Sequence, residues 1–536
     1  MRGVFIQERV VPVARSPYRA DVAMFVGFVD RRRGKHLPDG DPTDETLVQP
    51  IVPTATQPGD PSVFEWLVSE GWARRNDTAA ANTRIDELLN IPVPVDTFDA
   101  FGRLFAWEFR PCGVNFCDTY LGAAVRSFFA AGGRLAYIVR VDTPFGVPLT
   151  TADAAAVVAA RQANLEKLVP TAIIPSPGDD RIAWKGVWTV YGLPDVSFIT
   201  APDLADVVRT GLAADPPLPP DPPIPVAFEA CSAPSTAGED DEHIRDLLAP
   251  TADESGYLAW SRTVTTLAQQ VALVRSNGGL REMTVVAAIP IPDDPTVGTD
   301  LTKYLSEELG FAQPPFATSF LQLGFPWLVT QQGASGELPQ NLEPPEGLLC
   351  GTLARNALER GTFRSAAGRR LQTMLSTSPV LPGRDLADPS DTSTLSGRVS
   401  LIGATALGFQ LLSDVTTSLD PLYRLGQASR TMASLIRALR VIGEQASFEA
   451  SNEALWLWLR QRAEDVLRSF YVAGALVGSS EKDAFAVRCD RTTMSQDDLD
   501  SGRAIVTVTL AIASSIQRID LVITQHGTSA VPTGVG

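Results

Sequence analysis

The stretch "VRSFFAAGGRLAYIVRV", residues 125–141, has the pattern of a helix, a helix-ending glycine pair and a strand in direct succession. Asp118 or Thr119 can cap the helix, and Gly132 with Gly133 can end it, since glycine tolerates a left-handed C-terminal cap. Apolar residues follow the helical spacing first and then the strand spacing, at Leu121, Val125, Phe128 and then Leu135, Tyr137, Val139, Val141. The stretch predicts an αβ unit and contains no typical active-site motif.

Strand and helix signals alternate along much of the chain. Residues 283–292 are almost continuously apolar, as in the buried central strands of parallel sheets. Further expected elements are a strand at 22–30, a helix at 152–169, a strand–turn–strand at 187–204, a helix at 258–279, helices within 420–480, and strands at 504–513 and 519–524. The alternation between about 180 and 400 predicts an α/β layer.

The composition excludes several classes of protein. The chain has 536 residues, 44% of them hydrophobic, and a formal net charge of −17, which argues against a general nucleic-acid binder. No apolar run is long enough to cross a bilayer or to form the core of a signal peptide, so we expect cytoplasmic assembly and no membrane insertion. A molecule of this length is expected to contain more than one domain.

The reactive side chains form no catalytic pattern. There is no phosphate-binding glycine loop and no G-x-S-x-G or H-E-x-x-H motif. The three histidines, His36, His243 and His526, lie far apart in polar segments. Five cysteines are too scattered for a disulfide framework; Cys112 and Cys117 could bind a metal only with two further ligands, so we expect free or buried thiols. We therefore predict no catalytic residue, no cofactor and no metal.

Six segments, taken in order, resemble the contractile tail sheath family, which includes phage tail sheaths and the sheaths of phage-derived contractile injection systems. They are "GVFIQERV" (3–10), the stretch quoted above, "ITAPDL" (199–204), "FPWLVT" (325–330), "PPEGLLCGTLARNALERGTFRSAAG" (344–368) and "LWLRQRAEDVLRSFYVAGALVGSSEKDAFAVRCD" (457–490). Two passages depart from the family pattern: "IGATALG" (402–408) lacks an arginine, and "SIQRIDLVIT" (515–524) lacks the usual Pro-x-Glu-Phe. These departures concern the sheath subtype.

The resemblance implies a fold of class α/β and α+β with several domains, the central one subtilisin-like. The expected division is an N-terminal β arm (1–21), an N-terminal α/β sheath domain (22–180), a subtilisin-like α/β domain (181–400) with a proline-rich insertion (211–226) on the outer surface, a C-terminal sheath domain of helices and strands (401–503) and a C-terminal β arm (504–536). Without an Asp, His and Ser set, the subtilisin-like fold implies no protease.

The resemblance also implies a structural function. The chain would polymerise helically, in stacked hexameric rings, around an inner tube protein and contract to drive the tube through a target envelope. Baseplate and cap proteins would be further partners, and the particle would be a phage tail or a contractile injection system. The alternatives are a sheath-like baseplate or cap component, or a subtilisin-like hydrolase.

Strand arms at the two chain ends would link neighbouring subunits, because a strand added to a neighbour's sheet forms main-chain hydrogen bonds. The candidate arm residues are Val4, Phe5 and Ile6 near the N-terminus, and Val506, Val508, Leu510, Ile519, Leu521 and Ile523 near the C-terminus. The alternative is that each arm pairs within its own subunit. An apolar strand with no partner would risk aggregation, so some partner is required.

A run of arginines is the candidate contact with the inner tube. Between 423 and 443 there are four arginines and no acid. On a helix, Arg430, Arg437 and Arg440 lie close together, opposite an apolar face. With the family resemblance, this basic stripe is expected to face an acidic tube surface; the alternative is a solvated helix face.

Overall fold

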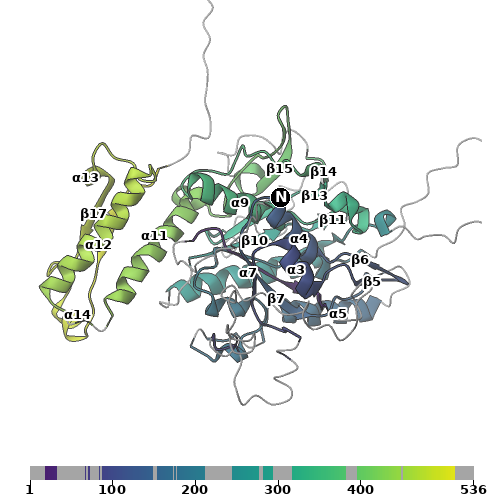
Figure 1. Cartoon of the computed structure of the whole chain (residues 1–536), viewed down its shortest axis with the longest axis horizontal. Helices are drawn as coiled ribbons and strands as arrows, with labels where there is room; N and C mark the ends of the chain where they lie inside the picture. The colour runs from purple at the N-terminus through teal and green to yellow at the C-terminus, as the bar shows by residue number, and fades with distance from the viewer. Residues whose placement is uncertain are drawn as a thin grey trace, which may run out of the picture.

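A computed structural model of the chain describes residues 19–32, 67, 70–72, 84, 87–148, 154–172, 174–176, 178–211, 244–276, 282–293, 317–381, 395–447, 449 and 451–513. The described residues form a large body, up to residue 425, and a smaller C-terminal unit, residues 426–513. The unit projects from one side of the body (Figure 1).

The quoted stretch forms the predicted αβ unit. Helix α4 (Tyr120–Ala130) is capped by Thr119, whose side chain accepts a hydrogen bond from the Gly122 N–H. The chain then turns at Gly132, with φ of +106°, and enters strand β7 (Ala136–Asp142). Because both faces of β7 are buried, its residues Ala136–Val141 all lie in the interior rather than only every second one.

One eight-stranded sheet forms the centre of the body. In sheet order its strands are β16 (Gly408–Leu411), β15 (Ser400–Thr405), β12 (Leu321–Phe325), β10 (Thr284–Ala288), β8 (Phe198–Thr200), β1 (Ala23–Phe28), β7 and β3 (Val93–Val95). The six inner strands are parallel, and only the two edge strands, β16 and β3, run antiparallel to their neighbours. The predicted α/β layer is confirmed, and the strand predicted at 283–292 is present in its first part as β10, which is shorter than predicted.

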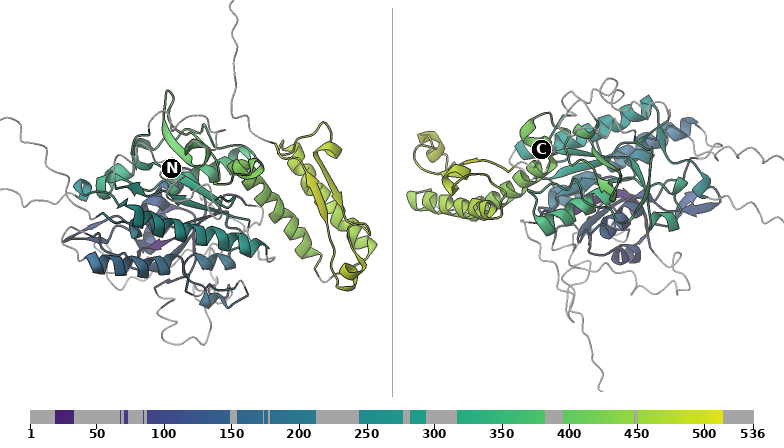
Figure 2. Two further views of the ribbon diagram at one scale, coloured as in Figure 1. Left: turned by 180° about the vertical axis from the view of Figure 1, so that it is seen from behind. Right: turned by 90° about the horizontal axis from the view of Figure 1, so that it is seen from above.

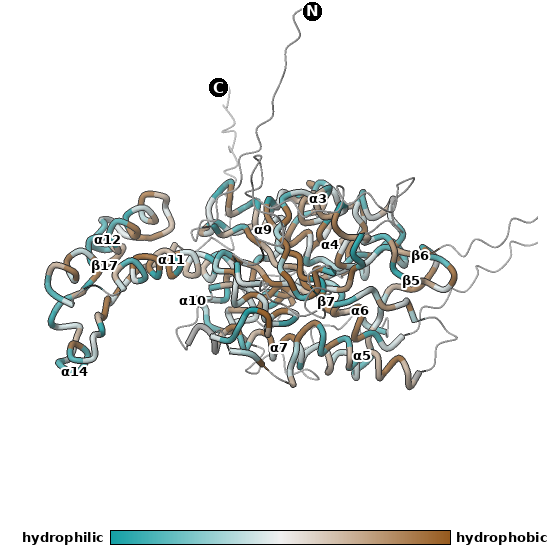
Figure 3. Tube along the Cα trace, turned by 60° about the horizontal axis from the view of Figure 1, so that its bottom comes forward, coloured by the Kyte–Doolittle hydropathy of each residue, from teal (hydrophilic) through white to brown (hydrophobic). Residues whose placement is uncertain are grey.

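Helices cover both faces of this sheet. Helix α4 and helix α9 (Glu346–Arg360) pack on one face, with α3 (Phe98–Leu104) beside them, whereas α5 (Ala154–Leu168) and α7 (Glu254–Ser276) pack on the other. Figure 2 shows these layers from two further directions, and Figure 3, coloured by hydropathy, shows hydrophobic segments in the interior of the body. The body is thus a three-layer α/β/α structure.

Short two-stranded sheets lie around the central one. They are β2 (Asp30–Arg31) with β4 (Phe105–Ala106), β5 (Arg110–Cys112) with β6 (Asn115–Cys117), β9 (Thr251–Ala252) with β11 (Ile291–Pro292), and β13 (Trp327–Thr330) with β14 (Met374–Ser378). The short helices α6 (Leu204–Val207) and α10 (Pro421–Arg424) complete the α-helices of the described part of the body.

Helices α4 and α9 pack closely because glycines line their contact. A Cβ atom on Gly347 would lie 2.1 Å from the carbonyl oxygen of Ala124, and one on Gly351 would lie 2.4 Å from that of Phe128. On the other side of α4, the Phe128 ring contacts the ring of Phe25 on β1, with centroids 5.4 Å apart. The segment 344–368, one of the six quoted above, therefore packs directly on the opening stretch.

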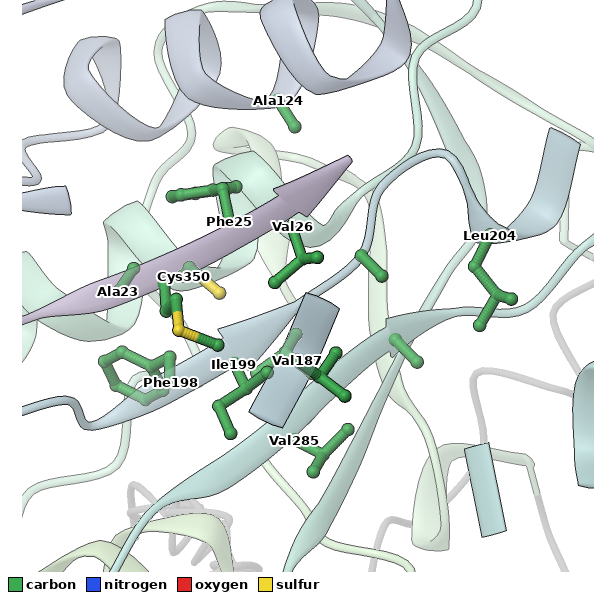
Figure 4. Close-up of a cluster of buried hydrophobic side chains, with 14 of the residues drawn as sticks. Ala23, Phe25, Val26, Ala124, Val187, Phe198, Ile199, Leu204, Val285 and Cys350 are labelled. Atoms are coloured by element: carbon green, nitrogen blue, oxygen red, sulfur yellow. The ribbon is translucent and has the colours of Figure 1, made fainter. Parts of the chain in front are cut away.

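The core continues through the sheet. Figure 4 shows Phe25 and Val26 on opposite sides of β1, with Val187, Ile199 and Val285 in the same buried cluster. All five side chains are at most 1% exposed. One contiguous apolar cluster runs from Val22 to Leu411 in the sequence, so strands from both halves of the body share a single interior.

The boundary predicted at 180/181 is therefore wrong. Strands β1, β7 and β3 come from the predicted N-terminal domain, and the other five strands of the sheet come from the region after residue 181. The boundary at 400/401 is also wrong, because β15 and β16 belong to the central sheet. The C-terminal unit begins only with the helix at Gly426.

One expected strand is a helix. Residues Gly186–Gly192 form a 3₁₀ helix rather than the first strand of the predicted pair, whereas the second strand is present as β8. Every residue of this 3₁₀ helix is buried. An apolar segment buried on all sides shows no periodicity that distinguishes a strand from a helix.

Several predictions concern residues outside the described ranges. They are the N-terminal arm with Val4, Phe5 and Ile6, the proline-rich insertion beyond Gly211, the terminal strand with Ile519, Leu521 and Ile523, and His36, His243, His526 and Cys231.

Candidate functional site

The C-terminal unit is built on two long helices and a small sheet. Its elements are α11 (Gly426–Gln445), α12 (Glu453–Val472), α13 (Glu481–Ala484), β17 (Phe485–Arg488), α14 (Gln496–Asp500) and β18 (Thr507–Leu510). Leu435 of α11 and Leu467 of α12 are at most 1% exposed and pack against the sheet residues Phe485 and Val487. The unit thus has its own apolar core.

Strand β18 pairs with β17 of the same chain. The pairing is antiparallel, with Phe485 opposite Leu510. Beyond the end of β18, the Ala513 N–H donates to the carbonyl oxygen of Ala475, which precedes β17 in the same chain. Val506, Val508 and Leu510 face the unit's core, whereas Thr507 and Thr509 between them are exposed. The expectation that residues 504–512 leave the subunit as an arm is corrected, because one edge of β18 is taken by its own chain.

Both outer edges of this small sheet carry no further strand among the described residues. The Ala511 N–H donates to the Ala484 carbonyl oxygen, so odd-numbered residues of β18 direct their main-chain groups toward β17. Alternation then directs the N–H groups of Val508, Leu510 and Ile512 away from β17. The sheet can accept a strand from another chain there.

The predicted tube contact at Arg430 is wrong, because this side chain is buried in the body. Its Nη1 and Nη2 donate to Asp414 Oδ1 at 2.9 Å and Oδ2 at 2.6 Å, and Nη1 also lies 3.3 Å from Gln322 Oε1. Burial opposes ionisation of Asp414, but the Arg430 charge and the hydrogen bonds outweigh it and lower the pKa of Asp414.

The same correction applies to Arg437, which is 7% exposed. Its guanidinium donates to main-chain carbonyl oxygens of the body rather than to a surface partner. Arg440 is partly exposed and lies 3.2 Å from the Glu282 carboxylate. The arginine stripe of α11 therefore faces the body, and the apolar stripe opposite it faces α12. Sequence reasoning found the two faces but missed the partners Asp414 and Glu282.

The carboxyl ends of the parallel strands, where α/β proteins usually bind ligands, contain buried acids. Asp203 Oδ2 accepts from the Phe28 N–H at 2.7 Å, and Oδ1 accepts from the Leu121 N–H at 3.1 Å. Glu346 Oε1 accepts from the Ala288 N–H at 2.8 Å. Burial raises the pKa of Asp203 to about 7 and that of Glu346 to about 8. Through these hydrogen bonds both acids join strand ends to helices, which is a structural role.

The raised pKa of Glu346 predicts that the stability of the folded chain depends on pH. Its carboxyl stays protonated in the folded chain up to about pH 8, whereas the unfolded carboxyl loses its proton near 4.5. Its contribution to the free energy of unfolding is complete below pH 4.5 and is lost as the pH rises to about 8. We expect Glu346→Gln to flatten the decline in thermal stability between pH 5 and 9.

Thermal unfolding of the two proteins across that range checks this prediction. Glu444→Gln, which alters an exposed acid on α11, serves as the control and should keep the slope of the native chain. Equal slopes for the native chain and Glu346→Gln would contradict the assignment.

The described cysteines are buried side chains that pack in the interior. Cys112, Cys117, Cys350 and Cys489 are buried and form no disulfide within the described residues, and the Cys112 and Cys117 thiols are hydrogen-bonded across the β5–β6 hairpin. In the described ranges, no three His, Cys, Asp or Glu side chains are grouped so that they could hold a metal ion. None of the helices in those ranges has the length and apolar character needed to span a bilayer.

Comparison with solved structures covers both the body and the C-terminal unit. A chain from the contracted helical sheath of the anti-feeding prophage (AFP) aligns with a TM-score of 0.52 at 15% identity, over 98% of this chain and 99% of that one. A chain from the contracted PVC sheath complex of an extracellular contractile injection system aligns at 0.51, with 18% identity and 98% of each chain covered. The chain has the fold of these sheath structures.

The sheath fold also matches a chain from the AFP baseplate in its contracted state, with a TM-score of 0.55, 16% identity and 97% of each chain covered. No protein-family model matches the sequence, and no curated protein matches it either. The chain thus shares the fold of these structures at very low sequence identity.

Proposed function

We propose that this chain is the structural subunit of a contractile sheath, which polymerises helically around an inner tube and contracts to drive that tube through a target envelope. The observation that carries the proposal is the sheath fold shared over nearly the whole chain with the AFP and PVC structures. The subunit would assemble in the cytoplasm as stacked hexameric rings, with baseplate and cap proteins at its ends.

The small sheet of the C-terminal unit would join the subunits. Its outer edges would accept strands from the ends of neighbouring chains, residues 1–18 and 514–536, which contain Val4, Phe5, Ile6, Ile519, Leu521 and Ile523. In this arrangement β18, with Val508 and Leu510, accepts a strand rather than donating one. The expected likeness of the body to subtilisin remains a prediction from the family resemblance.

A second candidate function is a baseplate or cap component, which is favoured by the similar chain in the AFP baseplate structure. Electron microscopy of the full chain, produced together with its tube protein, separates the two. A sheath subunit should form long helical tubes, and a baseplate or cap component should form only discrete rings. Monomers under all conditions would contradict both.

A further inference from the structure

Arg437 lies where three neighbouring strands of the body begin. Because β10, β8 and β1 are adjacent and parallel, their amino ends meet at one edge of the sheet. The segments that lead into these strands contain Glu282, Asp195 with Ser197, and Arg19 respectively. Helix α11 crosses this edge and places the guanidinium of Arg437 among them.

The guanidinium contacts all three lead-in segments. Nη1 donates to the Arg19 carbonyl oxygen at 2.6 Å, and Nη2 donates to the Glu282 carbonyl oxygen at 2.6 Å. Nε lies 3.2 Å from the same Glu282 oxygen, and both Nη atoms lie 3.2 Å from Ser197 Oγ. The Ser197 hydroxyl in turn lies 3.4 Å from the Arg19 carbonyl oxygen. A planar donor with five N–H groups suits such a set of acceptors, whereas an ammonium group does not reproduce it.

The junction between the body and the C-terminal unit is largely polar. Within the described residues, no buried apolar cluster contains members from both parts. The contacts of α11 with the body include two ion pairs, Arg430 with Asp414 and Arg440 with Glu282, and a hydrogen bond from Ser429 Oγ to the Ser319 carbonyl oxygen. Directional contacts of this kind fix an orientation better than a nonpolar surface does.

Among the residues that Arg437 contacts, Arg19 is important for the proposed assembly because it directly follows residues 1–18 in the chain. Its own side chain forms an ion pair with Asp21, which is fully buried. The Arg19 carbonyl oxygen, to which Arg437 donates, thus lies directly after the segment proposed to enter a neighbour's sheet. The helix that bears Arg437 carries the sheet proposed to accept such a segment.

We propose that Arg437 is a positioning residue that fixes Arg19, and with it the point where the N-terminal segment 1–18 leaves the body, relative to the C-terminal unit. A single guanidinium then sets the distance and orientation between the strand that a subunit donates and the sheet with which the same subunit accepts a neighbour's strand. This inference rests on the proposed function for its role in assembly. The physical link between Arg19 and α11 does not depend on that function.

Hydrogen exchange of the full chain tests the link. Arg437→Met removes every donor but keeps a long side chain, so exchange should become about tenfold faster in two segments together, residues 20–23 and 430–441. Strand β12 should exchange at its native rate, and Arg437→Lys should give an intermediate effect. Arg468→Met, the same replacement at an exposed site on α12, should change neither segment.

Faster exchange confined to α11, or no change in either segment, would overturn the proposal. If Arg437→Met does not fold, Ser197→Ala takes its place, since it removes one acceptor and the hydroxyl contact with Arg19. That variant should accelerate the same two segments by roughly threefold. An unchanged rate at residues 20–23 in a folded Ser197→Ala protein would count equally against the link.

Assembly separates this inference from the proposed function. Where the native chain forms tubes, Arg437→Met should give disordered tubes or tubes of altered pitch, and Arg468→Met should give native ones. Native tubes from Arg437→Met would refute the positioning role alone. Absence of tubes from the native chain would refute the proposed function and the positioning role in assembly, while the exchange experiment would still decide the link between Arg19 and α11.

Discussion

Removing residues 1–18 and 514–536 together is expected to abolish polymerisation while leaving the body and the C-terminal unit folded. Each inserted strand would contribute several main-chain hydrogen bonds of roughly 1 kcal/mol, so the loss should exceed about a hundredfold in polymer formation. Sedimentation measures the polymer, and circular dichroism measures the folded structure. Deletion of one end alone should weaken assembly less than deletion of both. Native tubes from the doubly truncated chain would contradict the proposal.

A single substitution on β18 tests the same surface without shortening the chain. Val508→Pro removes an N–H that points away from β17, so it should block an incoming strand and leave the β17–β18 pairing in place. Val508→Ala is the matched control, because it shortens the side chain and keeps the N–H. Assembly of the Ala variant and failure of the Pro variant is the expected pattern; equal assembly by both would exclude this edge as the acceptor.

Replacing Asp414 by Asn is expected to lower the free energy of unfolding by about 3–5 kcal/mol, because it leaves the Arg430 charge buried and uncompensated. Asp414 Oδ2 also accepts from the Ala366 N–H at 2.8 Å, and Oδ1 accepts from Gln322 Nε2 at 3.1 Å. The carboxylate therefore joins α11 of the C-terminal unit to two segments of the body. Chemical denaturation of the purified chain gives the measurement.

Two comparisons sharpen that experiment. Asp465→Asn removes the carboxylate of an exposed ion pair with Arg468, and it should change stability little, since exposed pairs contribute little. Replacing both buried partners, with Asp414→Leu and Arg430→Met, should recover part of the loss. A cost for Asp414→Asn no greater than that for Asp465→Asn would show that the buried pair does not hold α11.

The sequence predicted local structure well where patterning and boundaries agreed. Thr119 and Gly132 mark the two ends of helix α4 chemically, and the apolar run at 283–292 has the composition of a central parallel strand. Strand order carries no such local signal. The sheet places β1 between β7 and β8, so segments assigned to different domains share one interior, and the predicted boundaries failed for that reason.

The candidate site was harder to predict for a similar reason. Helical spacing separates the arginine face of α11 from its apolar face, but it does not say which face meets the body. The acceptors of Arg437 include main-chain carbonyl oxygens 155 and 418 residues away, and main-chain acceptors leave no trace in side-chain patterns. In β18, apolar residues alternate with threonines, which distinguishes its inward face but does not identify its partner β17.

The most direct measurement is a cryo-EM reconstruction of particles formed by this chain with its tube protein. The account predicts a helical lattice in which the β17–β18 sheet of each subunit gains strands from residues 1–18 and 514–536 of neighbouring subunits. A lattice in which this sheet remains two-stranded, with both chain ends folded on their own subunit, would contradict it.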